Sequence, residues 1–405
     1  MEKLPFIRIQ GEDAKSIGLC HGKKLRDRVR RTWKWYERLF MSIGANTKML
    51  RSFGTRFANV IREFDKTCDS TYSDEIEGIA EGCGLEPYAI YCLNARTEIS
   101  LQLLQRCSEM PSESTSAFSP KTGILQRCSE MPSECTSAYS SKTAILAQNW
   151  DWDEDCEKLA VITEIRTKEH AILTMHEPGM LAKTGMNSNG IGVCLNALHI
   201  PKDWKKGDLN GVPVHVLLRA ILDCKSYDDV RTLLLKRAKI GTSAHILLGC
   251  KDGRHDMIEF AGSLVDFIRA SKHTMALHTN HYLRCESLAN DSRCGFPVDA
   301  PADSSSSRAR FLRGKKLIEK LKDEADVPAM KALLRDDTGK FPICREMIQS
   351  SSKSGGLASA LGRIGTVCSV VMDLKTLTMH ITKGSPIRNA YASHTLSRTS
   401  SSSEK

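Results

Sequence analysis

The stretch that decides the fold runs Cys135-Thr-Ser-Ala-Tyr139 and resumes as Ile145-Leu-Ala-Gln-Asn-Trp-Asp151-Trp. Small and hydroxyl-bearing residues in the first run, and aliphatic and aromatic residues in the second, predict two strands joined by a short turn. Such a hairpin returns the carboxylate of Asp151 to the side of Cys135. A nucleophilic thiol needs a base and an orienting acid nearby, so the hairpin is a candidate catalytic unit. Taken alone, a cysteine in a strand is more often a packed small residue.

The sequence before this hairpin favours helices, and the sequence after it favours strands. Apolar residues recur at helical spacing within 13–43 and about 51–66, Ser73 looks like the N-cap of a third helix, and Pro87 opens a helix that continues to about residue 104. Short β-rich runs follow at 160–167, 171–176, 192–197, 244–249, 257–261, 264–270, 274–279, 365–374 and 376–382. Helical patterns separate them at about 214–224, 227–236, 307–322 and 327–334. This order predicts an α+β layered domain and not a parallel βαβ array.

An internal repeat lies across the start of the hairpin. Residues 104–124 and 125–145 are identical at 17 of 21 positions. Two copies are too few for a solenoid, so we interpret the repeat as a local duplication or a gene-model artefact. The copies differ where Ser114 stands in the first and Cys135 in the second. Ser114 is a rival nucleophile, but Pro120-Lys-Thr-Gly-Ile and the second copy follow it instead of a Gln-Asn-Trp-Asp run, so its partner carboxylate is missing and we favour Cys135.

Length and composition bound the class of protein. The chain has 405 residues, 41% hydrophobic and 26% charged, which fits two to three globular domains or one large α/β domain. It contains no run of 18 apolar residues, and its start lacks the long apolar run of a signal peptide. Fifteen cysteines without a C-x-x-C pair argue against structural zinc and favour reduced thiols in a cytoplasmic protein. The net charge of +10 is scattered except at 23–31, so nucleic-acid binding is a weak alternative.

Short motifs along nearly the whole chain resemble the acyl-coenzyme A:6-aminopenicillanic acid acyltransferase family, also called isopenicillin N acyltransferase-like. Members of this family are N-terminal nucleophile hydrolases. The matching segments are Gly18-Leu-Cys-His21-Gly22, Glu75–Gly82, Leu93–Glu98, Cys135–Tyr139, Gln148–Asp151, Glu177–Gly179, Gly185–Gly190, Asn196–His199, Leu277–His281, Ser307-x-x-Arg310-x-x-Arg313 and Phe341–Arg345. Each motif is weak evidence alone, whereas their joint order and spacing make the resemblance specific.

The resemblance implies a four-layer αββα fold and a self-processing precursor. Helices of a pro-segment, residues 1–134, would wrap a sheet sandwich formed mostly by residues 135–384, and the Ser-rich residues 385–405 would be a disordered tail. The Cys135 thiol would attack the preceding carbonyl and cleave the Glu134–Cys135 bond, which leaves an α/β heterodimer. Family precursors are familiarly cleaved after glycine, which tolerates backbone strain. Glutamate at this position predicts slow or absent cleavage.

The resemblance also assigns roles to individual residues. After cleavage, the α-amine of Cys135 would act as general base for its own thiol. Asp151 would orient or balance the α-ammonium, and Asn280 would donate a hydrogen bond to the oxyanion. Arg345 would lie behind Asp151 and fix it by charge-assisted hydrogen bonds. Two further residues are expected to support these groups from behind, Tyr139 and Asn149. No metal and no cofactor are expected.

From the residues alone, structural alternatives remain for each polar candidate. Asn280 fits a strand-edge side chain, Arg345 fits a surface cation, and Asp153 equals Asp151 by composition. The resemblance implies amide cleavage or acyl transfer through an acyl-cysteine, with a small N-acyl amine or acyl-coenzyme A as substrate and neither nucleic acid nor membrane as partner. β-Alanyl conjugates of biogenic amines are the leading substrate class. The rival hypothesis is an unprocessed, degraded pseudo-enzyme that serves as a scaffold.

Overall fold

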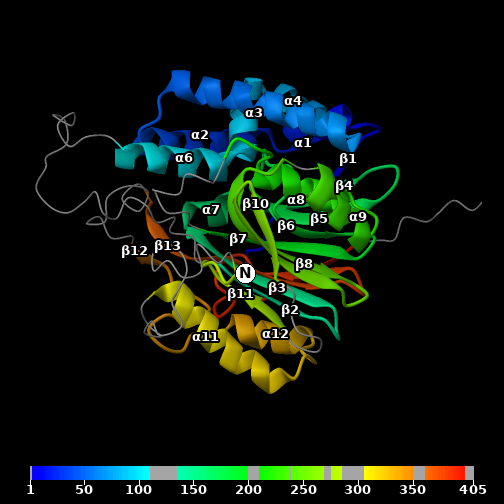
Figure 1. Ribbon diagram of the computed structural model, residues 1–405, viewed down its shortest axis with the longest axis vertical. Coiled ribbons are helices and arrows are strands. Elements are labelled where there is room, and N and C mark those ends of the chain that lie inside the picture. Colours follow the sequence, from blue (N-terminus) through cyan, green and yellow to red (C-terminus); the bar gives the residue numbers. More distant parts are fainter. Residues whose placement is uncertain are drawn as a thin grey trace, which may run out of the picture.

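The computed structural model has four layers, in which two β-sheets stack face to face and helices cover both outer sides (Figure 1). It describes residues 2–109, 135–198, 209–237, 239–268, 275–284, 305–349 and 361–396. The helices of the first hundred residues lie over one sheet, and the helices of residues 306–334 lie under the other. The predicted α+β class with αββα layers is confirmed. Glu134, Ser114 and most of the repeat lie outside the described residues.

The first sheet contains eight strands in the order β1-β4-β5-β6-β7-β8-β9-β10. They are β1 (Phe6–Gln10), β4 (Val161–Arg166), β5 (Ala171–His176), β6 (Thr184–Asn187), β7 (Ile191–Ala197), β8 (Thr242–Cys250), β9 (His255–Gly262) and β10 (Leu264–Ile268). Neighbours are antiparallel except β1 and β4, which run parallel. The central strands are buried on both faces because layers pack on both sides, so their polar side chains, such as Thr174 and His245, are buried as well.

The second sheet follows the order β11-β2-β3-β13-β14-β15, with β12 paired to β13. Its strands are β2 (Thr136–Ser140), β3 (Ile145–Asp153), β11 (Ala276–His278), β12 (Ile348–Gln349), β13 (Arg363–Asp373), β14 (Thr378–Ile381) and β15 (Ala392–Thr395). The predicted hairpin of β2 and β3 is confirmed, with Thr136 opposite Asn149. The disordered tail expected from residue 385 is wrong up to residue 396, because β15 pairs with β14; residues 397–405 lie outside the described part.

Six helices precede β2, and five more follow it in the described ranges. They are α1 (Ala14–Lys24), α2 (Arg26–Ser42), α3 (Thr47–Cys68), α4 (Tyr72–Cys83), α5 (Pro87–Asn94), α6 (Arg96–Glu109), α7 (Asp155–Leu159), α8 (Val214–Asp223), α9 (Tyr227–Thr232), α11 (Ser306–Ile318) and α12 (Val327–Leu334). Ser73 is not a helix N-cap, because α4 begins one residue before it and the Ser73 hydroxyl instead bonds Asp65 at 2.6 Å. Ala95 splits the helix predicted from Pro87 into α5 and α6.

Helices α1 and α4 cross with their backbones in contact, and glycines make this possible. A Cβ atom at Gly18 would lie 2.0 Å from the Glu75 carbonyl oxygen, and one at Gly78 would lie 2.3 Å from the Lys15 carbonyl oxygen. The motif that carries Gly18 is therefore a packing device. His21 of the same motif accepts a hydrogen bond from the Gly179 N–H at 3.1 Å, which ties the helical layer to the first sheet.

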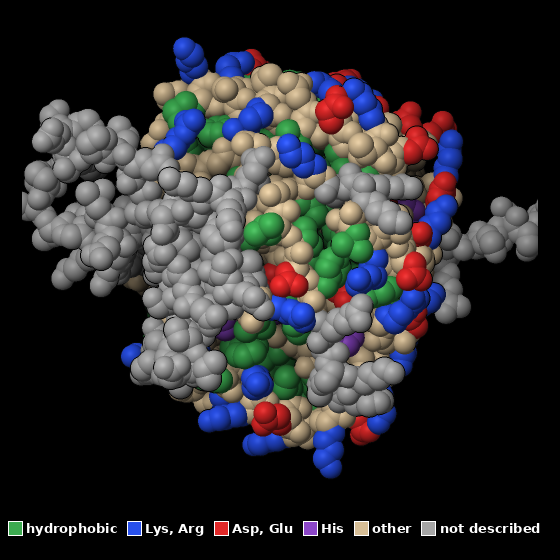
Figure 2. Space-filling view, in the orientation of Figure 1, with side chains coloured by type: hydrophobic (Ala, Val, Ile, Leu, Met, Phe, Trp, Pro, Cys, Tyr) green, Lys and Arg blue, Asp and Glu red, His purple; other side chains and the backbone are tan. Residues whose placement is uncertain are grey.

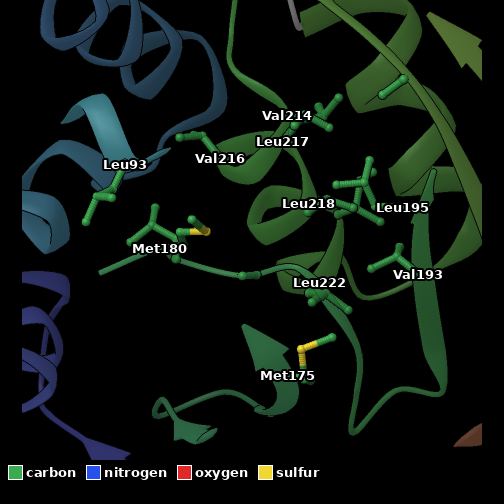
Figure 3. Close-up of a cluster of buried hydrophobic side chains, with 14 of the residues drawn as sticks. Leu93, Met175, Met180, Val193, Leu195, Val214, Val216, Leu217, Leu218 and Leu222 are labelled. Atoms are coloured by element: carbon green, nitrogen blue, oxygen red, sulfur yellow. The ribbon is translucent and has the colours of Figure 1, made fainter. Parts of the chain in front are cut away.

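One continuous apolar core joins the N-terminal helices to both sheets. Leu93 of α5, Leu218 of α8 and Leu195 of β7 all belong to it (Figure 3). A second cluster packs α11 and α12 against the second sheet and includes Met330 and Leu334. The helical segment before Cys135 is thus part of the same buried core as the strands after it.

The surface gives no support to the nucleic-acid alternative on the face that Figure 2 displays. Lys and Arg side chains are interspersed there with Asp and Glu side chains and do not gather into one basic patch (Figure 2). Within the described ranges, no helix combines the length and apolar character that a membrane crossing requires.

Candidate active site at the start of β2

Cys135 lies directly before β2 and is buried. The register pairs Thr136 with Asn149, so Cys135 and Asp151 lie at the same end of the hairpin. The charge of Asp151 and a hydrogen bond with its backbone both act on the Cys135 thiol. The structure therefore brings the two residues together, as the hairpin argument predicted.

Asp151 is fully buried and receives a hydrogen bond from Thr366, its direct neighbour on β13. The Thr366 hydroxyl donates to Asp151 Oδ1 at 2.7 Å, and a β-bulge follows Thr366 in this ladder. The Arg345 N–H donates to Thr366 Oγ1 at 2.9 Å, and the Arg345 carbonyl accepts from the Thr366 N–H at 3.1 Å. The connection from Arg345 to Asp151 therefore runs through its backbone and Thr366. Asp151 Oδ2 is buried without a hydrogen-bond partner in the described part.

The cation that acts electrostatically on Asp151 is Arg310 of α11. This side chain is fully buried. Its Nη1 donates to the Cys135 carbonyl and to Thr136 Oγ1, both at 2.8 Å, and its Nη2 donates to Asn280 Oδ1 at 2.9 Å. One guanidinium thus joins Cys135 and the start of β2 to Asn280. The sequence indicated Arg310 only as part of an S-x-x-R-x-x-R motif and assigned it no role.

Asn280 is held in place from three directions. Its N–H donates to Ser307 Oγ at 2.8 Å, its side-chain Nδ2 donates to the Ala197 carbonyl at 3.0 Å, and its Oδ1 accepts from Arg310. An amide NH₂ group carries two hydrogens, and the Ala197 contact uses one of them. The fixed amide thus retains one donor.

A second amide was missed as a site residue. Asn196 on β7 donates from Nδ2 to the carbonyls of Cys135 at 3.2 Å and His278 at 3.3 Å, while its Oδ1 accepts from Ser137 at 2.9 Å. It bridges the two sheets at Cys135. A polar residue inside an otherwise apolar buried strand was the available signal.

Burial sets the protonation states of this group. It raises the pKa of the Cys135 thiol to about 11, with Asp151 adding to the effect and Lys183 and Arg310 opposing it. It raises the pKa of Asp151 to about 7, although Arg310 and Thr366 both favour the carboxylate. In the uncleaved chain at neutral pH the thiol is therefore protonated, and Asp151 is divided between its acid and carboxylate forms.

Tyr139 and Asn149, which were expected to support the site residues, form their side-chain hydrogen bonds with other parts of the chain. The Tyr139 hydroxyl donates to the Cys250 carbonyl at 2.6 Å, at the far end of β2. Asn149 Nδ2 donates to the carbonyls of Leu334 at 2.8 Å and Ile343 at 3.1 Å, so it ties the hairpin to the end of α12. Both residues hold the hairpin to neighbouring elements.

A narrow cavity of about 20 Å³ opens onto Cys135. Its lining comes from α6, β3, the loop before β6, and strands β7 and β8. The residues are Arg96, Thr97, Cys135, Trp150, Trp152, Lys183, Leu195, Ala197 and Ala244. The Lys183 ammonium lies 3.1 Å from the centroid of the Trp150 ring and donates to Glu177 Oε2 at 2.9 Å. The helical segment before the hairpin therefore supplies part of the site wall. Within the described ranges, no cluster of three or more His, Cys, Asp or Glu side chains could hold a metal ion.

An αββα sandwich with a buried cysteine at the head of a strand and a carboxylate beside it is the arrangement typical of N-terminal nucleophile hydrolases. The family model described as acyl-coenzyme A:6-aminopenicillanic acid acyl-transferase matches residues 139–388. The chain belongs to this family, and the resemblance seen in its motifs is confirmed.

Individual relatives are distant. The chain is 26% identical over 217 residues to the acyl-coenzyme A:6-aminopenicillanic-acid-acyltransferase 40 kDa form of Emericella nidulans, which is 52% of this chain and 52% of that protein. It thus spans about half the length of this curated relative. A conjugated bile acid hydrolase from Clostridium perfringens aligns with 66% of this chain and 98% of its own at 15% identity and a TM-score of 0.44. Penicillin V acylase from Agrobacterium tumefaciens aligns with 62% and 82% at 13% identity and a TM-score of 0.40.

Proposed function

We propose that the chain is a self-processing cysteine enzyme that cleaves or transfers the acyl group of small N-acyl amines through an acyl-cysteine intermediate. The observation that carries the proposal is the position of Cys135 at the head of β2, beside Asp151 and joined to Asn280 through Arg310. Membership of an acyltransferase family supports this reaction type.

Processing would begin with the Cys135 thiol. Its sulfur attacks the Glu134 carbonyl carbon, the C–N bond breaks, and the thiol proton ends on the released nitrogen, which gives a thioester and a free α-amine. Water then hydrolyses the thioester, restores the thiol and leaves a carboxyl group on Glu134. Asp151, with a pKa of about 7 and an unpartnered Oδ2 in the described part, is suited to carry the proton between sulfur and nitrogen.

Turnover would use the new amine as a base, since an α-amine has a pKa of about 8. It accepts the thiol proton while sulfur adds to the substrate carbonyl, and that proton then passes to the departing amine. The remaining amide hydrogen of Asn280 is our candidate donor to the oxyanion. Water or a second amine resolves the acyl-cysteine, which decides between hydrolysis and acyl transfer.

We propose that the two segments stay together as an α/β heterodimer after cleavage. The N-terminal helices share one core with both sheets, so a cut before Cys135 would expose no new apolar surface at their interface. Arg96 of the N-terminal segment also lines the cavity at Cys135, so the site needs both segments. Eleven described cysteines are free thiols, which fits our proposal of a reducing, cytoplasmic setting.

Mass measurement under denaturing conditions tests the proposal. The wild type should give two fragments that divide before Cys135, whereas Cys135→Ala should stay intact. Cys92→Ala, a change at a buried cysteine of α5, is the matched control and should process normally. Fragments that begin at Ser114 would move the nucleophile to the first repeat copy. An intact wild type that is inert towards N-acyl amines would refute the enzyme and leave the scaffold alternative.

The substrates that we propose are based on the family resemblance, and a separate assay tests them. Amides of biogenic amines, with β-alanyl conjugates first, should be tested against acyl-coenzyme A donors with the same acyl group. Release of free amine from the amide supports hydrolysis, and consumption of an added amine by the acyl-coenzyme A supports transfer.

A further inference from the structure

The cavity at Cys135 contains two buried hydrogen-bond donors that the described residues leave unused. Arg96 is 6% exposed and its Nε has no acceptor in the described part; Trp152 is 3% exposed and its Nε1 has none either. Both side chains line the cavity. A buried donor without an acceptor is costly, and in a cavity next to a nucleophile it is accounted for when a ligand supplies the acceptor.

The buried side chains around this cavity carry an excess of positive charge, which also favours an anionic ligand. Lys183 and Arg96 share one carboxylate, Glu177, at 2.9 Å and 4.0 Å. Burial raises the pKa of Glu98 to about 7, so it supplies only part of a negative charge at neutral pH. Burial also lowers the pKa of His215, which keeps it neutral. Burial lowers the pKa of Lys183 to about 8, which leaves it mostly protonated at neutral pH. Two buried cations thus face little more than the charge of Glu177 and part of that of Glu98, and burying an uncompensated charge is unfavourable.

We propose that this cavity binds a carboxylate carried by the substrate, with Arg96 and Trp152 as its hydrogen-bond donors. The proposal rests on the proposed function, because it names the substrate class of the same site. The carboxylate lies close to the scissile carbonyl, since Cys135 lines the same cavity. A cavity of about 20 Å³ has room for little more than one water molecule, so it suits a group as small as a carboxylate and excludes an aromatic ring.

A substrate with a carboxylate at the end of its acyl chain differs in charge from a β-alanyl amide, whose acyl chain ends in an ammonium. A succinyl group and a β-alanyl group share two methylene carbons and differ in ending in a carboxylate or an ammonium. A butyryl group of similar length is neutral. The N-succinyl, N-butyryl and N-β-alanyl amides of tyramine are therefore a matched series. The carboxylate could instead stand on the amine side, and N-butyrylglycine tests that placement against N-butyryl tyramine.

The experiment measures kcat/KM for these four amides with the processed wild-type protein. We expect a carboxylate-bearing amide, N-succinyl tyramine or N-butyrylglycine, to exceed N-butyryl tyramine by about tenfold or more, and N-β-alanyl tyramine to be the poorest. The carboxylate amide with the higher kcat/KM shows whether the cavity binds a carboxylate on the acyl side or on the amine side of the scissile bond. Equal values for all four, or a preference for the butyryl or β-alanyl amide, would overturn the inference.

Two variants assign the effect to the cavity. Trp152→Phe removes the indole N–H and keeps an aromatic ring, and it should lower the ratio of carboxylate to neutral substrate about fivefold to tenfold. Arg96→Gln should lower the ratio further, and thermal unfolding will show whether it folds. Trp33→Phe makes the same change at a buried tryptophan of α2, outside the cavity lining, and should leave the ratio unchanged. An unchanged ratio in Trp152→Phe and in folded Arg96→Gln would refute the assignment.

If the protein is not an amide-cleaving enzyme, the experiment gives a result that differs from failure of the carboxylate proposal. In that case no amide is hydrolysed, but calorimetric titration still ranks the same four compounds by affinity. Tighter binding of a carboxylate amide than of N-butyryl tyramine, lost in Trp152→Phe, would keep the inference while the enzyme proposal falls. Equal affinities would overturn the inference.

Discussion

The Thr366 hydroxyl donates to Asp151 Oδ1 at 2.7 Å, across two directly paired positions of β13 and β3. The same hydroxyl oxygen accepts the Arg345 N–H at 2.9 Å. Thr366 therefore positions the buried carboxylate of Asp151 and connects it by hydrogen bonds to the backbone of Arg345. The family motifs in the sequence did not indicate this residue.

Removing the Thr366 hydroxyl should shift the pH dependence of the site. Thr366→Val keeps the shape of the side chain and loses the donor that lowers the pKa of Asp151, so that pKa should rise above about 7. We expect the rate of self-cleavage at pH 7 to fall about tenfold and to recover partly at about pH 9, where Asp151 ionises again. Time courses of fragment appearance at several pH values measure this. Thr378→Val, at the start of β14, is the control, and a loss that is equal at all pH values would contradict this positioning role of Thr366.

Arg310 and Arg313 form a matched pair on α11. Arg310 is fully buried and bonds the Cys135 carbonyl and Asn280, whereas Arg313 is partly exposed and pairs with Asp336. Arg310→Gln should reduce the proposed self-cleavage and amide turnover by about 100-fold or more, because it releases Asn280 and the Cys135 carbonyl. Arg313→Gln removes a surface ion pair and should change activity by less than about twofold. Comparable losses in the two variants would show that the helix matters but the guanidinium does not.

The hairpin and the layers could be predicted because their signals are local. Alternating or continuous apolar runs marked most strands, and the short turn between Tyr139 and Ile145 kept Cys135 and Asp151 at the same end of the hairpin. Strands β1, β6, β12 and β15 were missed, because each is short and is stabilised by pairing with its neighbours. A short, Ser-rich segment such as β15 resembles a tail until its partner β14 is known.

The roles of the site residues were predictable only in part. The hairpin and the family motifs indicated Cys135, Asp151 and Asn280. The roles of Arg310, Thr366 and Asn196 depend on contacts across 30, 215 and 61 positions of sequence, although Arg310 and Asn196 stood in motifs. Such contacts arise from tertiary packing, so a motif alone did not assign these roles. The expected link from Arg345 to Asp151 shows the same limit, since the structure makes it through the Arg345 backbone and Thr366.

The crossing of α1 and α4 should be sensitive to a single methyl group. At Gly78 an added Cβ would lie 2.3 Å from the Lys15 carbonyl oxygen, and backbone atoms cannot yield as a side chain does. Gly78→Ala should lower the free energy of unfolding by about 2 kcal/mol or more, measured by urea denaturation. Gly362→Ala, where the nearest atom would lie 3.5 Å away, is the control and should change it little. Equal stabilities would show that the helices can separate at no cost.

The buried Asp151 should give the uncleaved chain a pH-dependent stability. Burial raises its pKa from 3.8 to about 7, so in this interval the folded chain holds a proton that the unfolded chain has lost. The resulting stabilisation is complete below pH 3.8 and is lost as the pH rises through about 7, and a shift of about three pH units corresponds to about 4 kcal/mol.

This window can be measured in a Cys135→Ala background, which prevents cleavage. Adding Asp151→Asn should remove the titration, so the free energy of unfolding of the parent, relative to that of the Asn variant, should fall by up to about 4 kcal/mol between about pH 4 and about pH 8. Glu98→Gln should show a change in the same window, because burial raises the pKa of Glu98 to about 7 as well. Urea denaturation at several pH values provides the free energies. A constant difference between the Asp151 parent and its Asn variant over the whole window would show that the carboxyl is solvated in the folded chain, and it would contradict the burial on which the proton-carrying role of Asp151 depends.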